Sequence, residues 1–244
     1  MVRILKSAGS FVLRSVSEAP SDSFQFKSFI LKITGEVFRS KSVLKKVCQE
    51  IAELPMKKAL VVGGGNLIRG RERGLERRLL SDRIGLLSTI INGLILEETL
   101  RQYSETLHLS SLPIPGIVEG YSKEKAERAF NSRLTLILSG GTGNPFFSTD
   151  TACALRALEL SVDLVMKGTR VDGIYSKDPE RFPDAKFYKE LTYEKALRER
   201  LEIMDQTALL LLSEVRKPLV VFNIFKPGNI RKILKKSKVG SWVC

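Results

Sequence analysis

Short apolar segments alternate with longer segments of helical pattern from residue 28 onward, and this alternation constrains the fold more than any other feature. The strand candidates are 28–33, 59–62, 134–138, 163–167 and 218–223. The helix candidates are 41–54, 84–103, 122–131, 150–161, 193–201, 204–216 and 228–236. Strands that are apolar on both faces and separated by helices are typical of a parallel sheet covered on both sides. We therefore predict a three-layer αβα sandwich with a mostly parallel central sheet, formed by one domain over residues 28–244.

Glycine-bearing turns follow three of the predicted strands. Thr34-Gly35-Glu36 follows the first strand, Gly63-Gly64-Gly65-Asn66 the second, and residues 139–145 (SGGTGNP) the third. In such sheets ligands bind beyond the carboxyl ends of the strands, and glycine lets backbone N–H groups approach an oxyanion closely. One such turn is a weak signal, but three at one edge indicate more than one phosphate group.

The turns match neither of two common nucleotide motifs. No G-x-x-x-x-G-K-[ST] sequence occurs, which excludes a P-loop NTPase. Neither glycine turn fits G-x-G-x-x-G with its downstream acid, which argues against a dinucleotide site. Lys32, Arg69 and Lys167 lie at or beside strand ends. They are either solvated surface residues or contacts of an anionic ligand, and we favour the ligand.

Charge and rare residues limit the other functions. The net charge is +13, concentrated at residues 1–46, 69–83 and 226–244, which we interpret as two tails and one internal loop. Such an excess is compatible with nucleic acid, a membrane surface or phosphorylated small molecules. A single histidine, His108, excludes a histidine-based metal site and is expected to be structural. Three widely spaced cysteines suggest a reducing compartment, and no apolar run approaches the roughly 20 residues of a membrane span.

Residues 1–27 form an N-terminal extension with two open interpretations. Its first 17 residues are basic and rich in serine, with apolar residues interspersed, which resembles an organelle-targeting peptide more than a secretory signal. The alternative is a surface extension or a start site assigned too far upstream. We expect a cytoplasmic protein, with organelle targeting left open.

Four segments in this order resemble one family. GGGNLIRG (63–70), GGTGNPFFSTDTACALRALEL (140–160), VMKGTRVDGIYSKDP (165–179) and IMDQTALLL (203–211) leading to VFNIFKPG (221–228) are similar to bacterial-type uridylate (UMP) kinases of the amino-acid-kinase superfamily. The resemblance covers roughly residues 28–240. The glycine triplet marks only the superfamily, whereas GTGNPFFSTD followed by VDGIYSKDP is specific.

The resemblance implies a role for each matched residue. The implied ATP-binding residues are Lys32, Ile33, Thr34, Gly35, Gly65, Arg69, Thr169, Tyr175 and Asp178. The implied UMP-binding residues are Gly64, Asp82, Thr142, Gly143, Asn144, Pro145, Phe146, Phe147, Ser148 and Thr149. The implied catalytic residues are Lys32, Arg69, Asp150, Lys167 and Asp205. Thr149 is also expected to cap the following helix. Phe146 and Phe147 are expected either in the core or near a base.

The resemblance also implies ATP and UMP as substrates, Mg²⁺ bound with ATP, a homohexamer, and GTP and UTP as effectors. It implies neither a membrane partner nor a nucleic-acid substrate. Two alternatives remain: another superfamily kinase acting on a carboxylate or carbamate, and a non-enzymatic nucleic-acid-binding regulator on the same fold.

Overall fold

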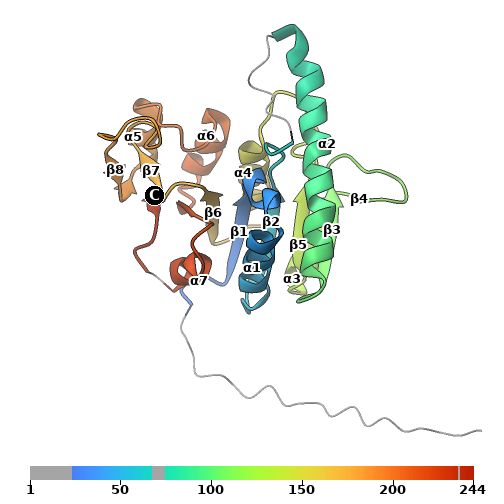
Figure 1. Cartoon of the computed structure of the whole chain (residues 1–244). Coiled ribbons are helices and arrows are strands. Elements are labelled where there is room, and N and C mark those ends of the chain that lie inside the picture. The colour runs from blue at the N-terminus through green and yellow to red at the C-terminus, as the bar shows by residue number, and fades with distance from the viewer. Residues whose placement is uncertain (1–23, 68–74, 236) are drawn as a thin grey trace, which may run out of the picture.

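The computed structural model describes residues 24–67, 75–235 and 237–244, and within them one large sheet organises the domain (Figure 1). Its strand order is β4-β3-β5-β2-β1-β6-β10-β11-β9, and every neighbouring pair is parallel except β10 and β11. The strands are β1 (Ser28–Ile33), β2 (Lys57–Val62), β3 (Thr106–Ser110), β4 (Glu119–Gly120), β5 (Thr135–Ser139), β6 (Leu164–Thr169), β9 (Glu190–Leu191), β10 (Leu219–Asn223) and β11 (Ser241–Val243). A separate antiparallel pair consists of β7 (Ile174–Tyr175) and β8 (Phe187–Tyr188).

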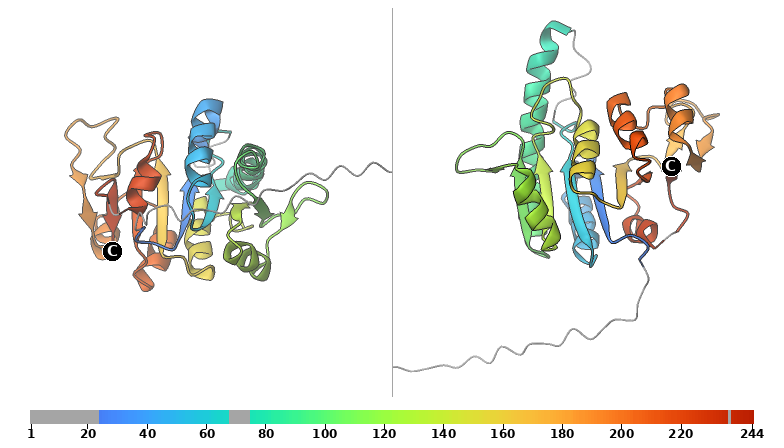
Figure 2. Two further views of the ribbon diagram at one scale, coloured as in Figure 1. Left: turned by 90° about the horizontal axis from the view of Figure 1, so that it is seen from below. Right: turned by 180° about the vertical axis from the view of Figure 1, so that it is seen from behind.

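Helices cover both faces of this sheet, as the views in Figures 1 and 2 show. One face carries α1 (Lys41–Ala52), α2 (Leu75–Leu100) and α7 (Asn229–Leu234). The other carries α3 (Lys123–Asn131), α4 (Thr149–Glu159), α5 (Tyr193–Arg198) and α6 (Gln206–Glu214). A 3-10 turn, η1 (Gly35–Arg39), joins β1 to α1. The predicted αβα sandwich with a mostly parallel sheet is confirmed.

Side chains alternate between the two faces of the sheet along the central strands, and this alternation divides the buried residues into two clusters, one on each face. In β1, Phe29, Leu31 and Ile33 pack on the side of α1, whereas Ile30 packs on the side of α4. Successive side chains of a strand point to opposite faces, so Lys32 points to the same side as Ile30. This parity places Lys32 near α4.

All five expected strands exist, but several elements escaped prediction. The short strands β4, β7, β8, β9 and β11 carry two or three residues each, too few for a periodic pattern.

The strand β3 contains His108, which is buried and lies 2.8 Å from the Ser139 hydroxyl through Nε2 and 3.1 Å from Glu97 through Nδ1. This arrangement agrees with a structural histidine.

Helix α2 corrects two expectations. It begins at Leu75, not at residue 84, because its charged first turns lack an apolar stripe that would reveal them in the sequence. Its segment Arg78–Leu100 is also long and apolar enough to cross a membrane by length and composition, contrary to the expectation that no run approaches that limit. Nevertheless α2 packs against α1, β3 and β5, so it serves as a covering helix of the sheet.

The two ends of the chain correct the charge interpretation. Residues 226–244 are not a tail, because they contain α7 and the sheet strand β11. Ion pairs join Lys226 to Asp172 at 2.6 Å and Arg231 to Glu53 at 2.7 Å. At the other end Phe24 already packs against the core, and residues 1–23 of the extension lie outside the described residues.

Candidate active site

The strand order brings the predicted phosphate-binding turns to one edge of the sheet. The neighbouring strands β5, β2, β1 and β6 are all parallel, so their carboxyl ends lie side by side. The glycine turns after the first three strands therefore adjoin one another. The approach is close: a Cβ on Gly35 would lie 2.8 Å from the backbone nitrogen of Gly65. Only glycine at position 35 allows these two turns to approach so closely.

Two lysines and one aspartate form the centre of this edge. Lys32 of β1 and Lys167 of β6 are directly paired in the sheet register, so their side chains lie on the same face. Asp150, in the first turn of α4, bridges them. Its Oδ2 accepts a hydrogen bond of 2.7 Å from Lys167 Nζ, and its Oδ1 lies 3.2 Å from Lys32 Nζ. Lys32 is more than a hundred positions from the other two residues in the sequence, and the fold joins all three.

Burial and charge set the ionisation of this cluster. The side chains of Lys32, Asp150 and Lys167 are 13–14% exposed. Burial alone would raise the pKa of Asp150, but Lys167 and Lys32 outweigh it and hold that pKa well below its ordinary value. Burial lowers the pKa of Lys167, against the opposing charge of Asp150. Asp150 is therefore ionised at neutral pH and unsuited to remove a proton.

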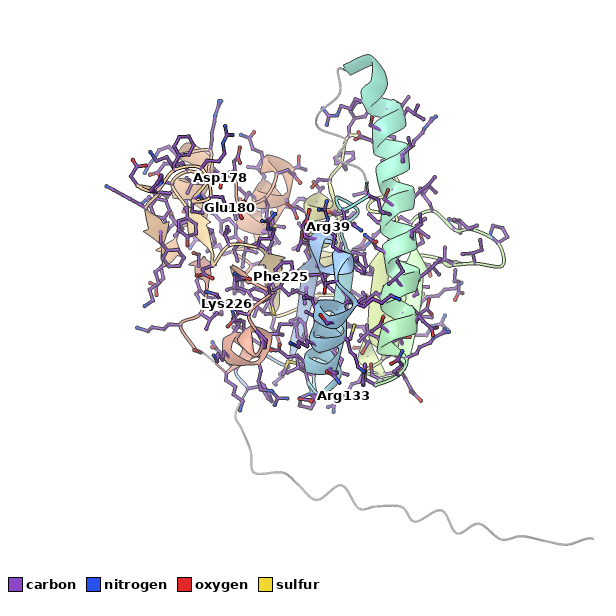
Figure 3. The ribbon with its side chains drawn as sticks, viewed as in Figure 1. Arg39, Arg133, Asp178, Glu180, Phe225 and Lys226 are labelled. Atoms are coloured by element: carbon purple, nitrogen blue, oxygen red, sulfur yellow. The ribbon has the colours of Figure 1, made fainter. Side chains whose placement is uncertain are left out.

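Two cavities adjoin the lysines on the side of β6. One, of about 510 Å³, is lined by Lys167 together with the predicted ATP-site residues Thr169, Tyr175 and Asp178. The second, of about 350 Å³, is lined by Lys32, Thr34, Gly65, Lys167, Thr169 and Asp178 among others. Glu180 also lines the second cavity, and Figure 3 shows it close to Asp178 on the segment after β7. Six of the nine expected ATP residues thus line shared cavities.

Of the described members of the predicted ATP set, Ile33 and Gly35 are not among the residues that line these two cavities. Ile33 is completely buried, so only its backbone can face a nucleotide. Arg69 lies outside the described residues.

The loop between β5 and α4, residues 140–148, holds the predicted UMP-binding side chains. The backbone N–H of Phe146 donates to Asp82 Oδ2 of α2 at 2.8 Å. The Arg78 guanidinium lies 5.0 Å from the centre of the Phe146 ring and its Nε 3.6 Å from Asp82. Asp82 therefore lies beside this loop, as its predicted role requires. Phe146 and Phe147 are 55% and 46% exposed, which excludes the core alternative.

The backbone of this loop is strained. Gly140, Gly141 and Gly143 have positive φ, and so does Phe146 at +72°. A non-glycine residue in this conformation costs of order 1 kcal/mol and persists where surrounding contacts fix it, often at binding sites. The contact of Phe146 N–H with Asp82 is one such fixing contact.

Ser148, not Thr149, caps helix α4. The Ser148 hydroxyl accepts hydrogen bonds from the backbone N–H groups of Asp150 and Thr151, whereas Thr149 is already the first helical residue. The expected cap is therefore wrong by one residue. Asp205 accepts hydrogen bonds from Ser148 Oγ, from Thr151 Oγ1 at 2.8 Å and from the N–H of Ala208 at 3.0 Å. Its carboxylate joins the starts of α4 and α6, and it also lines a cavity of about 450 Å³ with Asp150 and Lys167.

Sequence reasoning missed the polar residues that hold the glycine turns. Asn92 of α2 is completely buried and donates to the Gly63 carbonyl at 2.7 Å. Thr89, one turn earlier, accepts the N–H of Gly140 at 2.8 Å. Their spacing of three residues within an apolar helix is a signal that could have flagged them, because buried polar side chains require partners.

The site offers no cage for a metal. Within residues 24–67, 75–235 and 237–244, no three His, Cys, Asp or Glu side chains lie together in a way that could hold an ion. Asp150, the central carboxylate, is already neutralised by two lysines.

Comparison with known proteins agrees with this geometry. The family model described as "Amino acid kinase family" matches residues 27–223. The chain belongs to the amino acid kinase family. Among known amino acid kinases, uridylate kinase of Methylococcus capsulatus is 38% identical over 229 residues, covering 88% of this chain and 96% of that protein. Uridylate kinase of Escherichia coli K12 is 37% identical over 233 residues, covering 89% of this chain and 96% of that protein.

A solved amino acid kinase has closely similar architecture. The crystal structure of UMP kinase from Bacillus anthracis superposes with a TM-score of 0.83 at 32% identity, covering 89% of this chain and 96% of the other. The family match over residues 27–223 includes the sheet edge described above, so the similarity is not limited to one motif. This amino acid kinase is therefore a phosphotransferase.

Proposed function

We propose that this protein is a UMP kinase that transfers the γ-phosphoryl group of ATP to UMP, giving UDP and ADP, in pyrimidine nucleotide biosynthesis. The observation that carries the proposal is the pair of lysines in register, bridged by Asp150, between the cavities near β6 and the loop 140–148. The relatives named uridylate kinase, similar over almost their whole length, support UMP as the acceptor.

The chemistry needs alignment and charge neutralisation more than covalent participation by the protein. An oxygen of the UMP phosphate forms a bond to the γ-phosphorus, and the bond from that phosphorus to the β–γ bridging oxygen breaks, so ADP leaves with the electron pair. The attacking oxygen is already negative, so no base is required. Lys32 and Lys167 neutralise the charge that spreads over the transferred group, while ionised Asp150 holds both ammonium groups in place.

The grouping of side chains suggests where each nucleotide binds. Thr169, Tyr175 and Asp178 would surround the adenine and ribose of ATP, and Thr34, Gly35 and Gly65 its phosphates. Gly64, Asp82 and residues 142–149 would bind UMP. Arg69 would act beside the phosphates, and Asp205 would contribute by fixing the start of α4.

Mg²⁺ would enter the site with ATP, held by phosphate oxygens, because the described residues supply no metal cage. When bound it supplies further neutralisation of phosphate charge. We also propose a cytoplasmic homo-oligomer, a hexamer by its resemblance to the family, with GTP and UTP as effectors. The free thiols of Cys48, Cys153 and Cys244 are compatible with a reducing compartment.

The test is an ADP-release assay with a panel of acceptors. Purified protein with ATP and Mg²⁺ is offered UMP, CMP, dUMP, glutamate or aspartate, with an acceptor-free reaction as the control. We expect release above the control with UMP and none with the amino acids. Release with an amino acid and none with UMP would overturn the proposal in favour of a carboxylate kinase. No release with any acceptor, together with salt-dependent binding of RNA or DNA, would favour a regulator.

A further inference from the structure

Arg156 is a buried charged residue that the phosphoryl transfer itself does not use. It lies on α4 with only 7% of its surface exposed, and its guanidinium carbon is 3.6 Å from the centre of the Tyr121 ring. Nη1 donates to Glu159 Oε2 at 2.6 Å, and Nη2 donates to Ser111 Oγ at 3.1 Å. A buried arginine with an ion pair, a hydrogen bond and a ring contact from three segments fixes the relative position of the elements it joins.

Ser111 extends this contact to the loop 140–148. Its hydroxyl donates to the carbonyl of Gly141 at 2.8 Å, so its lone pair is free to accept from Arg156. Its backbone N–H donates to the Ser139 carbonyl at 3.1 Å. A Cβ on Gly143 would lie 3.3 Å from the Ser111 carbonyl oxygen, so Ser111 lies directly against the loop.

The connection joins the two ends of the loop. Gly141 lies just after β5, where the loop begins, and Arg156 lies two turns into α4, the helix at which the loop ends. Between them the backbone passes through the strained φ of Phe146. Strain of this kind persists only when surrounding contacts over-determine the conformation, and the path Arg156–Ser111–Gly141 is such a contact.

We infer that Arg156 and Ser111 are positioning residues that hold the loop 140–148 in the conformation that binds the acceptor nucleotide. The inference rests on the proposed function, in which this loop binds UMP. It predicts that damage to the connection weakens recognition of UMP selectively. The cavities assigned to ATP are lined by other segments. Damage to the connection should therefore leave recognition of ATP unchanged.

The test compares steady-state constants for both substrates in Ser111→Ala, Arg156→Gln and a control, Ser104→Ala. Ser104 also makes a partly buried hydroxyl contact, at 3.2 Å to Thr135, but at the opposite end of the sheet. We expect Ser111→Ala to raise the KM for UMP about three- to tenfold, the equivalent of one lost hydrogen bond, with the KM for ATP within about twofold. Arg156→Gln should raise it at least as much, and Ser104→Ala should change neither constant.

Thermal unfolding separates this role from a merely structural one. Ser111→Ala removes one small hydroxyl and should stay folded, which keeps the test decisive even if Arg156→Gln does not fold. If Ser111→Ala lowers the Tm but leaves the ratio of the KM values for UMP and ATP unchanged, the inference is overturned. An equal rise in the two KM values would also overturn it. Failure of the unaltered protein to phosphorylate UMP would instead overturn the proposed function.

Discussion

Lys32 and Lys167 lie opposite each other on neighbouring strands, and the alternation that buries Ile30 and Val165 also points both ammonium groups toward α4. Two cations this close would repel each other, and the Asp150 carboxylate between them offsets that repulsion. Lys167 has a second partner, the Ile203 carbonyl. Among the described residues, the polar partner of Lys32 is Asp150, whose Oδ1 lies 3.2 Å from its Nζ. Lys32 is thus the better placed of the two to turn toward a bound phosphate.

Replacing Lys32 should therefore disable turnover. We expect Lys32→Ala to lower kcat on the order of 10²-fold or more, because it removes charge stabilisation of the transition state. Initial rates at saturating ATP and UMP measure this effect. Lys27→Ala is a suitable control, because Lys27 precedes the same strand and its side chain is exposed. An unchanged kcat in Lys32→Ala would remove this residue from the catalytic role.

Lys58 gives a stability prediction away from the site. It is 5% exposed and donates to the Leu54 carbonyl at 2.6 Å, and burial lowers its pKa from 10.5 to about 8. Between those values the unfolded chain binds the proton and the folded chain does not, so this residue makes folding more stable as pH rises from about 8 to 10.5. The effect is at most about 3 kcal/mol at 1.36 kcal/mol per pKa unit.

Urea unfolding at pH 7.5 and pH 9.5 tests this prediction. Lys58→Met should lose the relative gain in stability at the higher pH, while Lys57→Met, at a partly exposed neighbouring position, should behave like the unaltered protein. An identical pH dependence in Lys58→Met and the unaltered protein would contradict it.

At the residue scale, the sequence predicted where functional residues lie along the chain better than it predicted which residues they contact. The lysines were visible because each interrupts an apolar strand near its end. Their pairing with Asp150 depends on strand register and on the placement of α4, which no local pattern encodes. Arg156 and Asn92 were overlooked because a polar residue in a helix is usually solvated, and only the packed structure shows that these two are buried.

The start of α4 is the element whose local design matters most for the site, because it carries both Ser148 and Asp150. Ser148→Ala should lower the free energy of unfolding by about 1 kcal/mol, the usual effect of removing a helix cap. It should also weaken UMP binding, since Ser148 ends the loop 140–148. Thr149→Ala is the matched control and should cost less stability, because the Thr149 side chain does not make the capping contact. Denaturant unfolding of both variants measures the difference, and a larger loss in Thr149→Ala would contradict the observed cap.

Helices and strands with a strong apolar pattern could be predicted from the sequence. Short strands that form only because they pair with other strands could not. The strand β1 matches its predicted bounds because a mostly apolar run of six residues, with Lys32 as its one charged member, precedes a glycine turn. In contrast, β11 exists because it pairs with β9 and β10, a tertiary contact of three residues. The early start of α2 at Leu75 reflects a charged helical turn without an apolar stripe.

The whole molecule shows how the net charge of +13 is distributed. The basic C-terminal segment belongs to the domain and is partly neutralised by Asp172 and Glu53. Among the described residues, Lys32 and Lys167 are the cationic groups that meet at the sheet edge. The excess charge therefore does not by itself indicate a nucleic-acid partner.

The contacts of the first described residues set the limit for truncation. Gln25 N–H donates to the Leu234 carbonyl at 3.1 Å, the Phe26 ring stacks on Trp242 at 6.3 Å, and Lys27 N–H donates to Asp163 at 2.7 Å. We expect deletion of residues 1–23 to leave Tm and kcat unchanged, and deletion of residues 1–27 to lower Tm. Thermal unfolding and activity of the two truncations provide the comparison. Loss of folding on removal of residues 1–23 would show that the extension is part of the domain.

The central claim, that the protein is a UMP kinase, is tested most directly by following the phosphoryl group. The protein is incubated with ATP labelled at the γ-phosphate, Mg²⁺ and UMP, and the nucleotides are then separated, with Lys32→Ala as the matched control. The account predicts that the label appears in UDP with the unaltered protein and that Lys32→Ala lowers its rate of appearance about a hundredfold or more. Label that remains in ATP, or that is released only as inorganic phosphate, would contradict it.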